Sequence, residues 1–535
     1  MKAVFYNGKV LVSADKGFKD YVVINGNKIE EVGDDFDPSR FAGYDLVDLD
    51  GKMLMAGFTD AHAHPFTSAF QMSQININYE SDPTGVIETA REYIEKHPNK
   101  EKFFGIGYAE VGFGIEGPNR HMLDAICPDK PVILVGASGH EAFVNTAALK
   151  ACGIDENTPD PIPGTQFFKR DETGYPTGHL IESGPITQVV LGLQPFVIEE
   201  AKETLLKIFD DFASYGITSI DDCGFIPYLK EPAEELLDEM IASGQMKQRI
   251  FGSNHINCLE EADAWEEYLN HMRDKYDTDM VRYNTFKIIN DGIVEACSAS
   301  MTEPFEGHDE LVMPLIYGED LRNICVKAAS EGFDVHLHGI GDNTVHENLL
   351  AAKAIRDAGY DDTIITIAHT QCVLEEDIPK FAEYDVIANT TGVWHYGDPA
   401  AYDLIGKRAD RMFPMYSIIK CGAKMSLGSD FPGDEYGPQP LNSIETATTR
   451  QMLGDPDSPI LQPESERLPM DELIKGFTET AVYQVRMDDK LGTIEPGKYA
   501  DFIILDQNLY EVDPYELRNV KVCMTVMNGE VTYQA

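Results

Sequence analysis

Basic residues are scarce in this chain of 535 residues, which has 43 Lys and Arg against 91 Asp and Glu and a formal net charge of −48. The excess of acidic residues is spread along the whole chain rather than held in one tail. A protein this acidic repels phosphate backbones and anionic membrane surfaces. The composition therefore argues against nucleic acid or a membrane surface as a partner.

Long apolar runs and paired cysteines are also missing. No run reaches about 18 apolar residues, which excludes a membrane-spanning helix. The first residues, MKAVFYNGKVLVSADKG, hold no apolar stretch of signal-peptide length. The nine cysteines are scattered and form no Cys-x-x-Cys pair, so we expect reduced thiols and a cytoplasmic location.

Both ends of the chain have the pattern of β structure. Residues 1–55 contain apolar or alternating runs separated by Asn-Gly and Asp-Gly turn signals, and residues 486–535 show the same pattern. Neither end has enough strands for a stable sheet of its own. We therefore predict that the two ends together form one small composite β-sandwich domain.

The middle of the chain, residues 56–485, alternates strand and helix patterns eight times. The predicted strands lie at 55–62, 216–223, 248–256, 283–291, 332–340, 363–370, 385–393 and 423–430. This alternation favours an α/β fold of the (β/α)8 TIM-like barrel type. Residues from about 66 to 215 are too many for one crossover and contain the strand-like pieces FFGIGY and PVILVGAS. We predict that they form an inserted subdomain after the first barrel strand.

Four of the predicted strands end in residues that bind metals. His62 and His64 close the stretch FTDAHAH, and residues two apart in a strand share a face, so both can reach one ion. His338, His369 and Asp430 lie at the ends of three further strands. Such ligands suit a first-row divalent ion at the mouth of a parallel barrel, most simply zinc, with manganese and iron as alternatives. The pattern indicates metal-assisted hydrolysis.

A lysine lies on the fourth predicted strand. Lys287 has apolar neighbours, Phe286 and Ile288, that should face the helices, so its own side chain should point into the barrel. A bare ammonium group beside two divalent cations would be strongly repelled. The alternative is that Lys287 pairs with a carboxylate such as Asp291 or Glu295.

The order of these residues resembles the amidohydrolase superfamily of metal-dependent hydrolases. Seven longer stretches are similar to its amidohydrolase-3 branch, which includes the N-substituted formamide deformylases. They are GFTDAHAHP, SGHEAFVNTAAL, FKIINDGIVE, VHLHGIGDNTV, IAHTQCVLEEDIPKFAE, GSDFP and LGTIEPGKYADFIILD. The similarity extends over about residues 20–506.

This resemblance implies roles for particular residues. The implied ligands of one or two divalent ions are His62, His64, Lys287, His338, His369 and Asp430. The resemblance also implies that Lys287 carries carbon dioxide as a carbamate, which turns a cation into a bridging carboxylate. It implies that Asp430 is the general base and acid that moves a proton from the metal-bound hydroxide to the leaving group. Metal coordination lowers the pKa of water from about 15.7 to about 7.

Some assignments near these residues stay open. His336 faces the barrel as well and could bind metal in place of His338, although the family pattern favours the histidine immediately before GIGD. Cys297 and Cys372 are expected to pack, although some amidohydrolases use a bridging cysteine. Asp342 is expected to hold the loop after the fifth strand by accepting hydrogen bonds from backbone donors.

Three residues are candidates for substrate binding. His140 in SGHEAFVN resembles a residue of the inserted subdomain that faces the bound substrate. Trp394 and Phe431 lie in the loops after the seventh and eighth strands and could line an apolar pocket. The alternative for all three is a packing or loop-forming role.

The sequence thus favours a hydrolase of a carbon–nitrogen bond other than a peptide bond, acting on a linear amide or an N-acyl or N-formyl small molecule. A mononuclear deaminase of the same superfamily is one alternative, but such enzymes usually lack the fourth-strand lysine and place an acid close after the fifth-strand histidine. A non-catalytic regulatory relative is another, but degenerate relatives should lose ligands and none is missing. Assembly into a homo-oligomer stays open.

Overall fold

The computed structural model describes residues 1–79, 81–114, 116–137, 139, 141–161, 163–164, 166–256 and 265–535. The chain divides into two compact units. The first comprises Met1–Pro65, Phe209–Gly224 and Met246–Ala535, and the second comprises Phe66–Ile208 and Phe225–Gln245.

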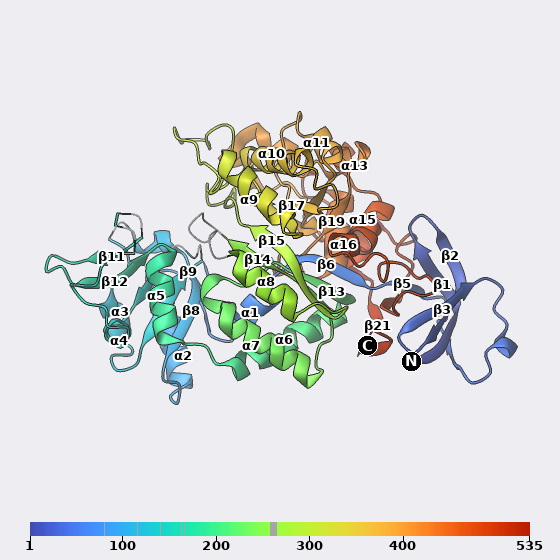
Figure 1. The fold of residues 1–535 in the computed structure, drawn as a ribbon, viewed down its shortest axis with the longest axis horizontal. Helices are drawn as coiled ribbons and strands as arrows, with labels where there is room; N and C mark the ends of the chain where they lie inside the picture. The colour runs from blue at the N-terminus through green and yellow to red at the C-terminus, as the bar shows by residue number, and fades with distance from the viewer. Residues whose placement is uncertain are drawn as a thin grey trace. The chain divides into compact units, whose positions relative to one another are not determined.

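Eight parallel strands of the first unit form a barrel sheet in which each strand neighbours the next one along the chain (Figure 1). They are β6 (Phe58–Ala63), β13 (Ile217–Asp222), β14 (Arg249–Ile256), β15 (Val281–Ile288), β16 (Asp334–Gly339), β17 (Ile365–His369), β18 (Val386–Thr390) and β19 (Met425–Leu427). Each overlaps one of the eight strands predicted from the sequence, so the TIM-like barrel is confirmed.

The first and last barrel strands meet just beyond β19. The backbone N–H of Asp430 donates to the carbonyl oxygen of His62 at 2.8 Å, and the N–H of His64 donates to that of Phe431 at 2.9 Å. The barrel is therefore nearly closed. These two hydrogen bonds also bring the histidines of β6 next to Asp430.

Helices separate and follow the barrel strands. They include α8 (Trp265–Lys275), α9 (Gly318–Ser330), α10 (Asp342–Asp357), α11 (Ile378–Glu383), α13 (Met415–Lys420), α14 (Pro440–Thr449), α15 (Met470–Phe477) and α16 (Glu479–Gln484). In α9 the buried residues Leu321, Ile324, Cys325 and Ala328 recur at spacings of three and four, which places them on one face of the helix. The apolar spacing read from the sequence therefore reflects burial against the barrel unit.

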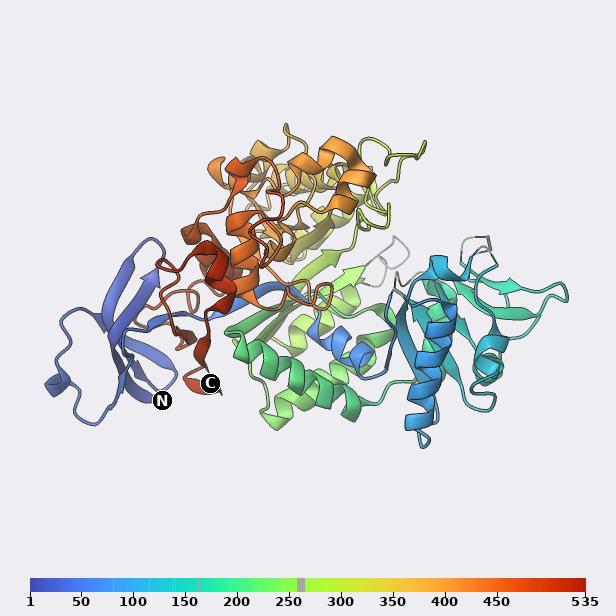
Figure 2. The same cartoon turned by 180° about the vertical axis from the view of Figure 1, so that it is seen from behind.

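A mixed sheet of eight strands joins the two ends of the chain. It contains β1 (Lys2–Ser13), β2 (Gly17–Asn25), β3 (Lys28–Gly33), β4 (Asp45–Asp48), β5 (Met53–Ala56), β20 (Phe502–Leu505), β21 (Val522–Met527) and β22 (Glu530–Gln534). Strand β5 pairs antiparallel with β20, so strands from the two ends are hydrogen-bonded to each other. Figures 1 and 2 both show the blue N-terminal strands beside the red C-terminal segment.

Two turns of this sheet follow directly from the sequence. Asp50 and Gly51 join β4 to β5 with φ values of 50° and 79°. Asn528 and Gly529 join β21 to β22 with φ values of 54° and 76°. In the antiparallel β21–β22 hairpin, two successive positive φ values match the twist of the strands. Strands β4 and β5 both run parallel to β1, so Asp50 and Gly51 form a tight connection between them and not a hairpin.

The second unit holds a six-stranded sheet inserted after β6. Its strands, in spatial order, are β11 (Phe167–Arg170), β12 (Pro176–Ile181), β10 (Glu141–Val144), β9 (Val132–Gly136), β8 (Phe103–Tyr108) and β7 (Ile75–Asn76). The strand-like piece FFGIGY is β8, and PVILVGAS contains all of β9. The two faces of this sheet pack against different apolar clusters. The neighbouring residues Phe103 and Phe104 of β8 point to opposite faces, and each belongs to a different cluster.

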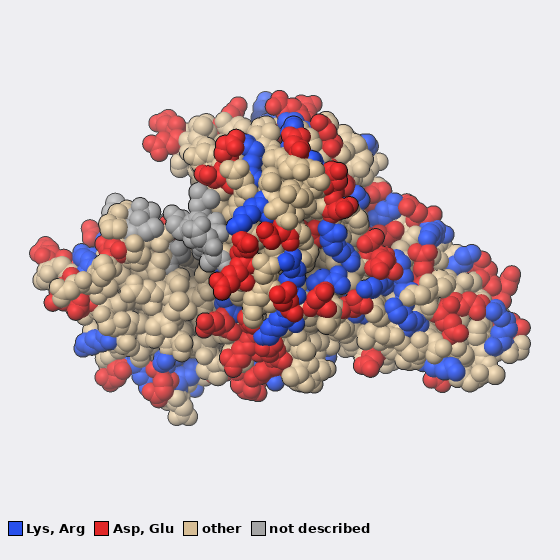
Figure 3. All heavy atoms as spheres, in the orientation of Figure 1, with Lys and Arg blue, Asp and Glu red and all other residues tan. Residues whose placement is uncertain are grey.

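The charged surface and the polarity of the helices are those expected from the acidic composition of the chain. Figure 3 shows Asp and Glu side chains over the whole face in view, interspersed with Lys and Arg. Among the described residues, every helix is too short or too polar to cross a membrane.

Candidate metal centre

The ends of the barrel strands bring the predicted metal residues together. His62 is the second-to-last residue of β6, and His369 is the last residue of β17. Lys287 is near the end of β15, and Asp430 follows β19. In a parallel barrel the carboxyl ends of all strands meet at one mouth. Residues that are hundreds of positions apart in sequence therefore share one site.

Two histidines and a carboxylate form the first ligand group. The Nε2 atom of His62 lies 3.4 Å from Oδ1 of Asp430, and Nε2 of His64 lies 3.8 Å from the same oxygen. The candidate ligand atoms of His62, His64 and Asp430 all lie within 4.8 Å of one another. This spacing fits one divalent ion with nitrogen and oxygen ligands.

The histidines of the centre are kept neutral. Burial, with the nearby charge of Lys287, lowers the pKa of His64 to about 3 and that of His62 well below its usual value. Burial first, and then neighbouring His338, lowers the pKa of His369 in the same way. Metals bind the neutral imidazole, so no proton has to be displaced from a charged ring at neutral pH.

Asp430 has an unusual carboxyl group. Burial raises its pKa to about 7, against the lowering effect of Lys287. Burial likewise raises the pKa of Asp60 to about 6, although Asp60 accepts hydrogen bonds from the backbone N–H groups of Ser429 and His62. A carboxyl group that titrates near pH 7 can both take up and release a proton at neutral pH.

Lys287 points into the barrel, as its position in the strand predicts. Its side chain is buried, and Nζ lies 3.4 Å from Nε2 of His62. Burial lowers the pKa of the amine, while Cys223, Asp430 and Asp221 oppose that change. Lys287 therefore reaches His62, one of the candidate metal ligands.

His338 is held by a carboxylate behind it. Its Nδ1 lies 2.8 Å from Oδ1 of Asp291, so that its Nε2 edge is the one left for a metal. Asp291 also accepts hydrogen bonds from Ser300 N, Ile340 N, Gly341 N and Thr344 Oγ1. The carboxylate considered as a partner of Lys287 is thus committed to His338 and its loop.

His369 lies beside an aromatic residue. The indole of Trp394 stacks on the imidazole of His369, with ring centroids 5.6 Å apart and 23° between the planes. The His369 ring is also 4.5 Å from that of His338. Nδ1 of His369 is buried and has no hydrogen-bond partner among the residues that the structure describes. A buried, orphaned imidazole nitrogen is costly unless something binds it, which fits a metal ligand.

The backbone at two of these residues is left-handed. His369 has a φ of 70° and Asp430 has a φ of 53°. Such values are uncommon for residues with a side chain and cluster at functional sites, where the surrounding structure enforces them. His369 is the last residue of β17, and Asp430 lies in the segment just after β19.

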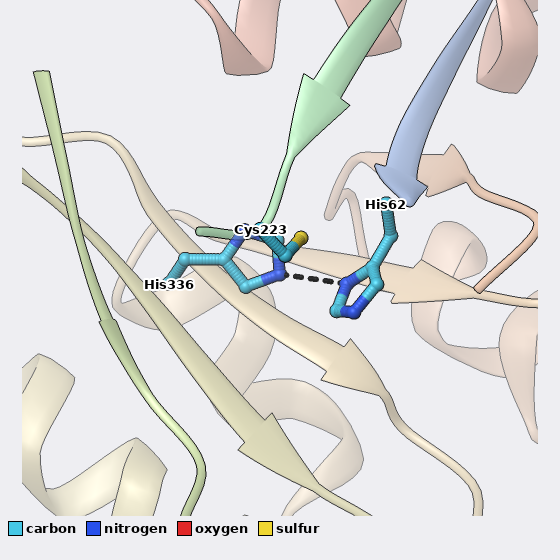
Figure 4. A group of neighbouring side chains, drawn as sticks. All are labelled: His62, Cys223 and His336. Carbon is cyan, nitrogen blue, oxygen red and sulfur yellow. Dashed lines mark hydrogen bonds between the residues drawn. The ribbon is translucent and has the colours of Figure 1, made fainter. Parts of the chain in front are cut away.

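The fifth strand contributes a second histidine to the interior. Nε2 of His336 lies 3.1 Å from Nδ1 of His62, and Nδ1 of His336 lies 3.7 Å from Oδ2 of Asp221. Cys223 completes a group with His62 and His336 whose candidate ligand atoms lie within 4.8 Å of one another (Figure 4). Cys223 is not among the metal ligands predicted from the sequence, although it is the last residue of the second predicted barrel strand, the position from which a ligand could be expected.

Three further residues singled out in the sequence have other contacts or lie outside the described residues. The ring of Phe431 packs edge-on against Phe212, with centroids 5.3 Å apart. Asp342 accepts hydrogen bonds from the backbone N–H and the hydroxyl of Thr302, so it holds the loop after the fourth strand and not the loop after the fifth. His140 lies outside the described residues.

Residues 45–533 match the amidohydrolase family. The chain belongs to this family. N-substituted formamide deformylase of Arthrobacter pascens is 25% identical to it over 98% of this chain and 96% of the relative. The exoenzymes regulatory protein AepA of Pectobacterium carotovorum is 28% identical over 73% and 85%.

A solved structure has the same fold. It is an uncharacterized metal-dependent hydrolase from Pyrococcus horikoshii, which is 20% identical with a TM-score of 0.75 and covers 96% of this chain and 99% of its own. Family membership, together with the histidine-rich strand ends, identifies the chain as an amidohydrolase, a metal-dependent hydrolase that acts on carbon–nitrogen bonds.

Proposed function

We propose that this amidohydrolase cleaves the carbon–nitrogen bond of a linear amide, either an N-acyl or an N-formyl small molecule. The observation that carries the proposal is the convergence of His62, His64 and Asp430 beside the buried amine of Lys287. The formamide deformylase of Arthrobacter pascens, similar over nearly the whole chain, supports a small amide as the substrate class.

A divalent ion, with zinc as our first choice, would be held by His62, His64, His338, His369 and Asp430, with one or two ions per chain. When bound, it would polarise the substrate carbonyl and lower the pKa of water to about 7. The donor set of neutral imidazoles and a carboxylate fits such an ion.

Lys287 is proposed to carry carbon dioxide as a carbamate. Burial favours its neutral amine, which is the form that reacts with carbon dioxide. The reaction joins Nζ to the carbon of carbon dioxide and releases one proton. The product is a carboxylate at the position of the former ammonium group, where it would no longer repel a cation.

Asp430 is proposed as the general base and acid. Its carboxylate would accept a proton from the attacking water and deliver it to the leaving nitrogen, which departs as an amine. The overall change consumes one amide and one water and yields one carboxylic acid and one amine.

Substrate selection is proposed to involve His140, Trp394 and Phe431. The indole of Trp394 stacks on the imidazole of His369, one of the candidate ligands. An indole beside the metal ligands would favour an apolar acyl group or N-substituent. The predicted role of His140 rests on its resemblance to the family motif alone.

An amide panel tests the proposal and separates it from its alternatives. The metal-loaded protein should release amines from N-substituted formamides or other N-acyl compounds, and a chelator should abolish the activity until divalent metal is restored. Release of ammonia from a ring amine would instead indicate a deaminase. A fully loaded protein without turnover of any amide would favour a regulatory role, the function named for the similar AepA.

We also propose a cytoplasmic enzyme that binds a small-molecule substrate, with its assembly into a homo-oligomer left open. The eight cysteines within the described residues are all free thiols, which agrees with a reducing compartment.

A further inference from the structure

Three buried side chains from three barrel strands converge below the predicted hydrolytic ligands. They are His62 on β6, Cys223 just after β13 and His336 on β16 (Figure 4). Their exposed fractions are 1%, 0% and 1%, and their candidate ligand atoms lie within 4.8 Å of one another. Two imidazoles and a thiol form a different donor set from the imidazoles and carboxylate at the mouth.

His62 presents a different ring nitrogen to each group. Its Nε2 lies 3.4 Å from Oδ1 of Asp430, whereas its Nδ1 lies 3.1 Å from Nε2 of His336. The ring therefore lies between two clusters on its opposite edges. The inner cluster does not need Asp430 or His64.

The two ring nitrogens of His336 face different neighbours. Its Nε2 faces His62, and its Nδ1 lies 3.7 Å from Oδ2 of Asp221, which is too long for a hydrogen bond. Gln484 fixes that carboxylate, because its Nε2 donates to Oδ2 of Asp221 at 2.7 Å and to the carbonyl oxygen of Ala61 at 2.8 Å. Nε2 is therefore the nitrogen of His336 that is placed to bind an ion together with His62.

The spacing of the two imidazoles also fits an ion. Zinc–nitrogen distances of about 2.0–2.1 Å and tetrahedral angles place two ligand nitrogens about 3.3 Å apart. The nitrogens of His62 and His336 are 3.1 Å apart. A hydrogen bond between the rings would explain this distance too, but it would not account for the thiol of Cys223, which lies within 4.8 Å of the candidate ligand atoms of both rings.

We propose that Nδ1 of His62, Sγ of Cys223 and Nε2 of His336 form a second metal site, which takes zinc through two nitrogens and one sulfur. Binding releases the thiol proton of Cys223 to solvent and leaves a thiolate–zinc bond. Three protein ligands leave one tetrahedral position of the zinc open, and all three side chains are buried. The proposal goes beyond the proposed amide hydrolysis and does not depend on the substrate.

Because both groups use His62, their occupancies are linked. The ring can serve the inner site through Nδ1 while Nε2 keeps its proton, or serve both sites after losing that proton. Cys223 and His336 belong to the inner site alone, so their variants separate it from the outer site.

X-ray absorption at the zinc edge of the zinc-loaded, full-length protein tests the proposal. A zinc–sulfur shell at about 2.3 Å is expected in addition to nitrogen and oxygen scatterers. Cobalt loading should give a sulfur-to-cobalt charge-transfer band in the near ultraviolet. In Cys223→Ser and Cys223→Ala both signals should vanish, and His336→Gln should weaken cobalt binding at this site by at least tenfold.

Cys325→Ala is the matched control, because Cys325 is equally buried but lies in α9. It should keep both sulfur signals. A wild-type edge with nitrogen and oxygen scatterers alone would overturn the inner site, and so would a sulfur shell that survives in Cys223→Ala. Amide hydrolysis is read separately, so a sulfur shell without turnover would count against the proposed function and not against this site.

Discussion

Nδ1 of His338 lies 2.8 Å from Oδ1 of Asp291, and this contact decides which edge of the imidazole faces the barrel mouth. Four further donors from the surrounding loop and helix hold the Asp291 carboxylate in place. The position of one metal ligand therefore depends on a residue that does not itself reach the metal.

Asp291→Asn should weaken metal binding by about 10–100-fold, because an amide no longer enforces the same tautomer and ring orientation of His338. Competition with a fluorescent chelator measures the loss. Asp377→Asn is the matched control, since Asp377 is also buried and its Oδ2 lies 2.9 Å from Nδ1 of His346. Equal affinity in Asp291→Asn and wild type would remove His338 from the ligand set.

Lys287→Ala should lose metal and turnover together, since the variant lacks the amine that is proposed to carry carbon dioxide. Short carboxylic acids or bicarbonate should restore part of the activity by filling the vacated space. Lys287→Arg should not restore it, because a guanidinium group does not form the carbamate. Native mass spectrometry checks the modification directly, and an active two-metal enzyme with unmodified Lys287 would contradict it.

The fold could be predicted largely because its signals are local. Strand and helix periodicities, and turn pairs such as Asn528 and Gly529, report on a few consecutive residues. The choice between His336 and His338 is not local. Both side chains lie on one face of β16. The register between β15 and β16 pairs His336 with Lys287, and the side chain of Lys287 in turn contacts His62.

The hydrogen-bond partners that hold the site residues in place could not be predicted from the sequence either. Asp291 was considered as a partner of Lys287 and instead serves His338, and Asp342 holds the loop at Thr302 rather than the loop after its own strand. Each depends on how a long loop returns to the barrel. Hydrophobic periodicity contains no information about that path.

Trp394→Leu should change which substrates are accepted while leaving the metal content unaltered. The indole stacks on His369, so its loss alters the shape of the space beside the ligands rather than the ligands themselves. Ratios of kcat/KM between bulky and small N-substituents should shift by about 10–200-fold. Phe431→Leu is a useful comparison, because its ring packs on Phe212. Unchanged ratios in both variants would mean that these aromatics only pack.

The metal-free protein should lose stability as the pH rises from 7 to 8, a range in which the buried histidines, whose ordinary pKa is about 6.5, are mostly neutral in the folded and unfolded chain alike. Burial raises the pKa of Asp221 to about 7 and that of Asp222 to about 8, against an ordinary value of 3.8. In this range the unfolded chain has already released these protons while the folded chain still holds them. Each such group therefore lowers the free energy of unfolding by up to about 1.4 kcal/mol per pH unit until its folded pKa is reached.

Denaturant titrations of the chelator-treated protein at several pH values measure this slope, the change in the free energy of unfolding per pH unit. Asp222→Asn should flatten it, because one of the groups that bind protons is removed. A slope of the opposite sign, or one that is unaffected by Asp222→Asn, would contradict the assignment of the buried carboxyls.

The last prediction concerns the joined ends of the chain. Arg249 donates to Asp501 through Nε at 2.7 Å and Nη2 at 3.1 Å, and the two side chains are 1% and 4% exposed. Asp501→Ala leaves a buried guanidinium without its partner and should cost about 3–5 kcal/mol of unfolding free energy. Asp357→Ala, which breaks an exposed pair with Lys353, should cost at most about 1 kcal/mol.

Deletion of residues 496–535 extends the same test. It removes β20, β21 and β22 together with Asp501, so β5 loses its antiparallel partner and exposes an unpaired strand edge. We expect an insoluble or inactive product, measured by its yield and by amide turnover. A soluble, active truncation would show that the N-terminal strands and the barrel are stable without the C-terminal strands, and the composite terminal domain would have to be abandoned.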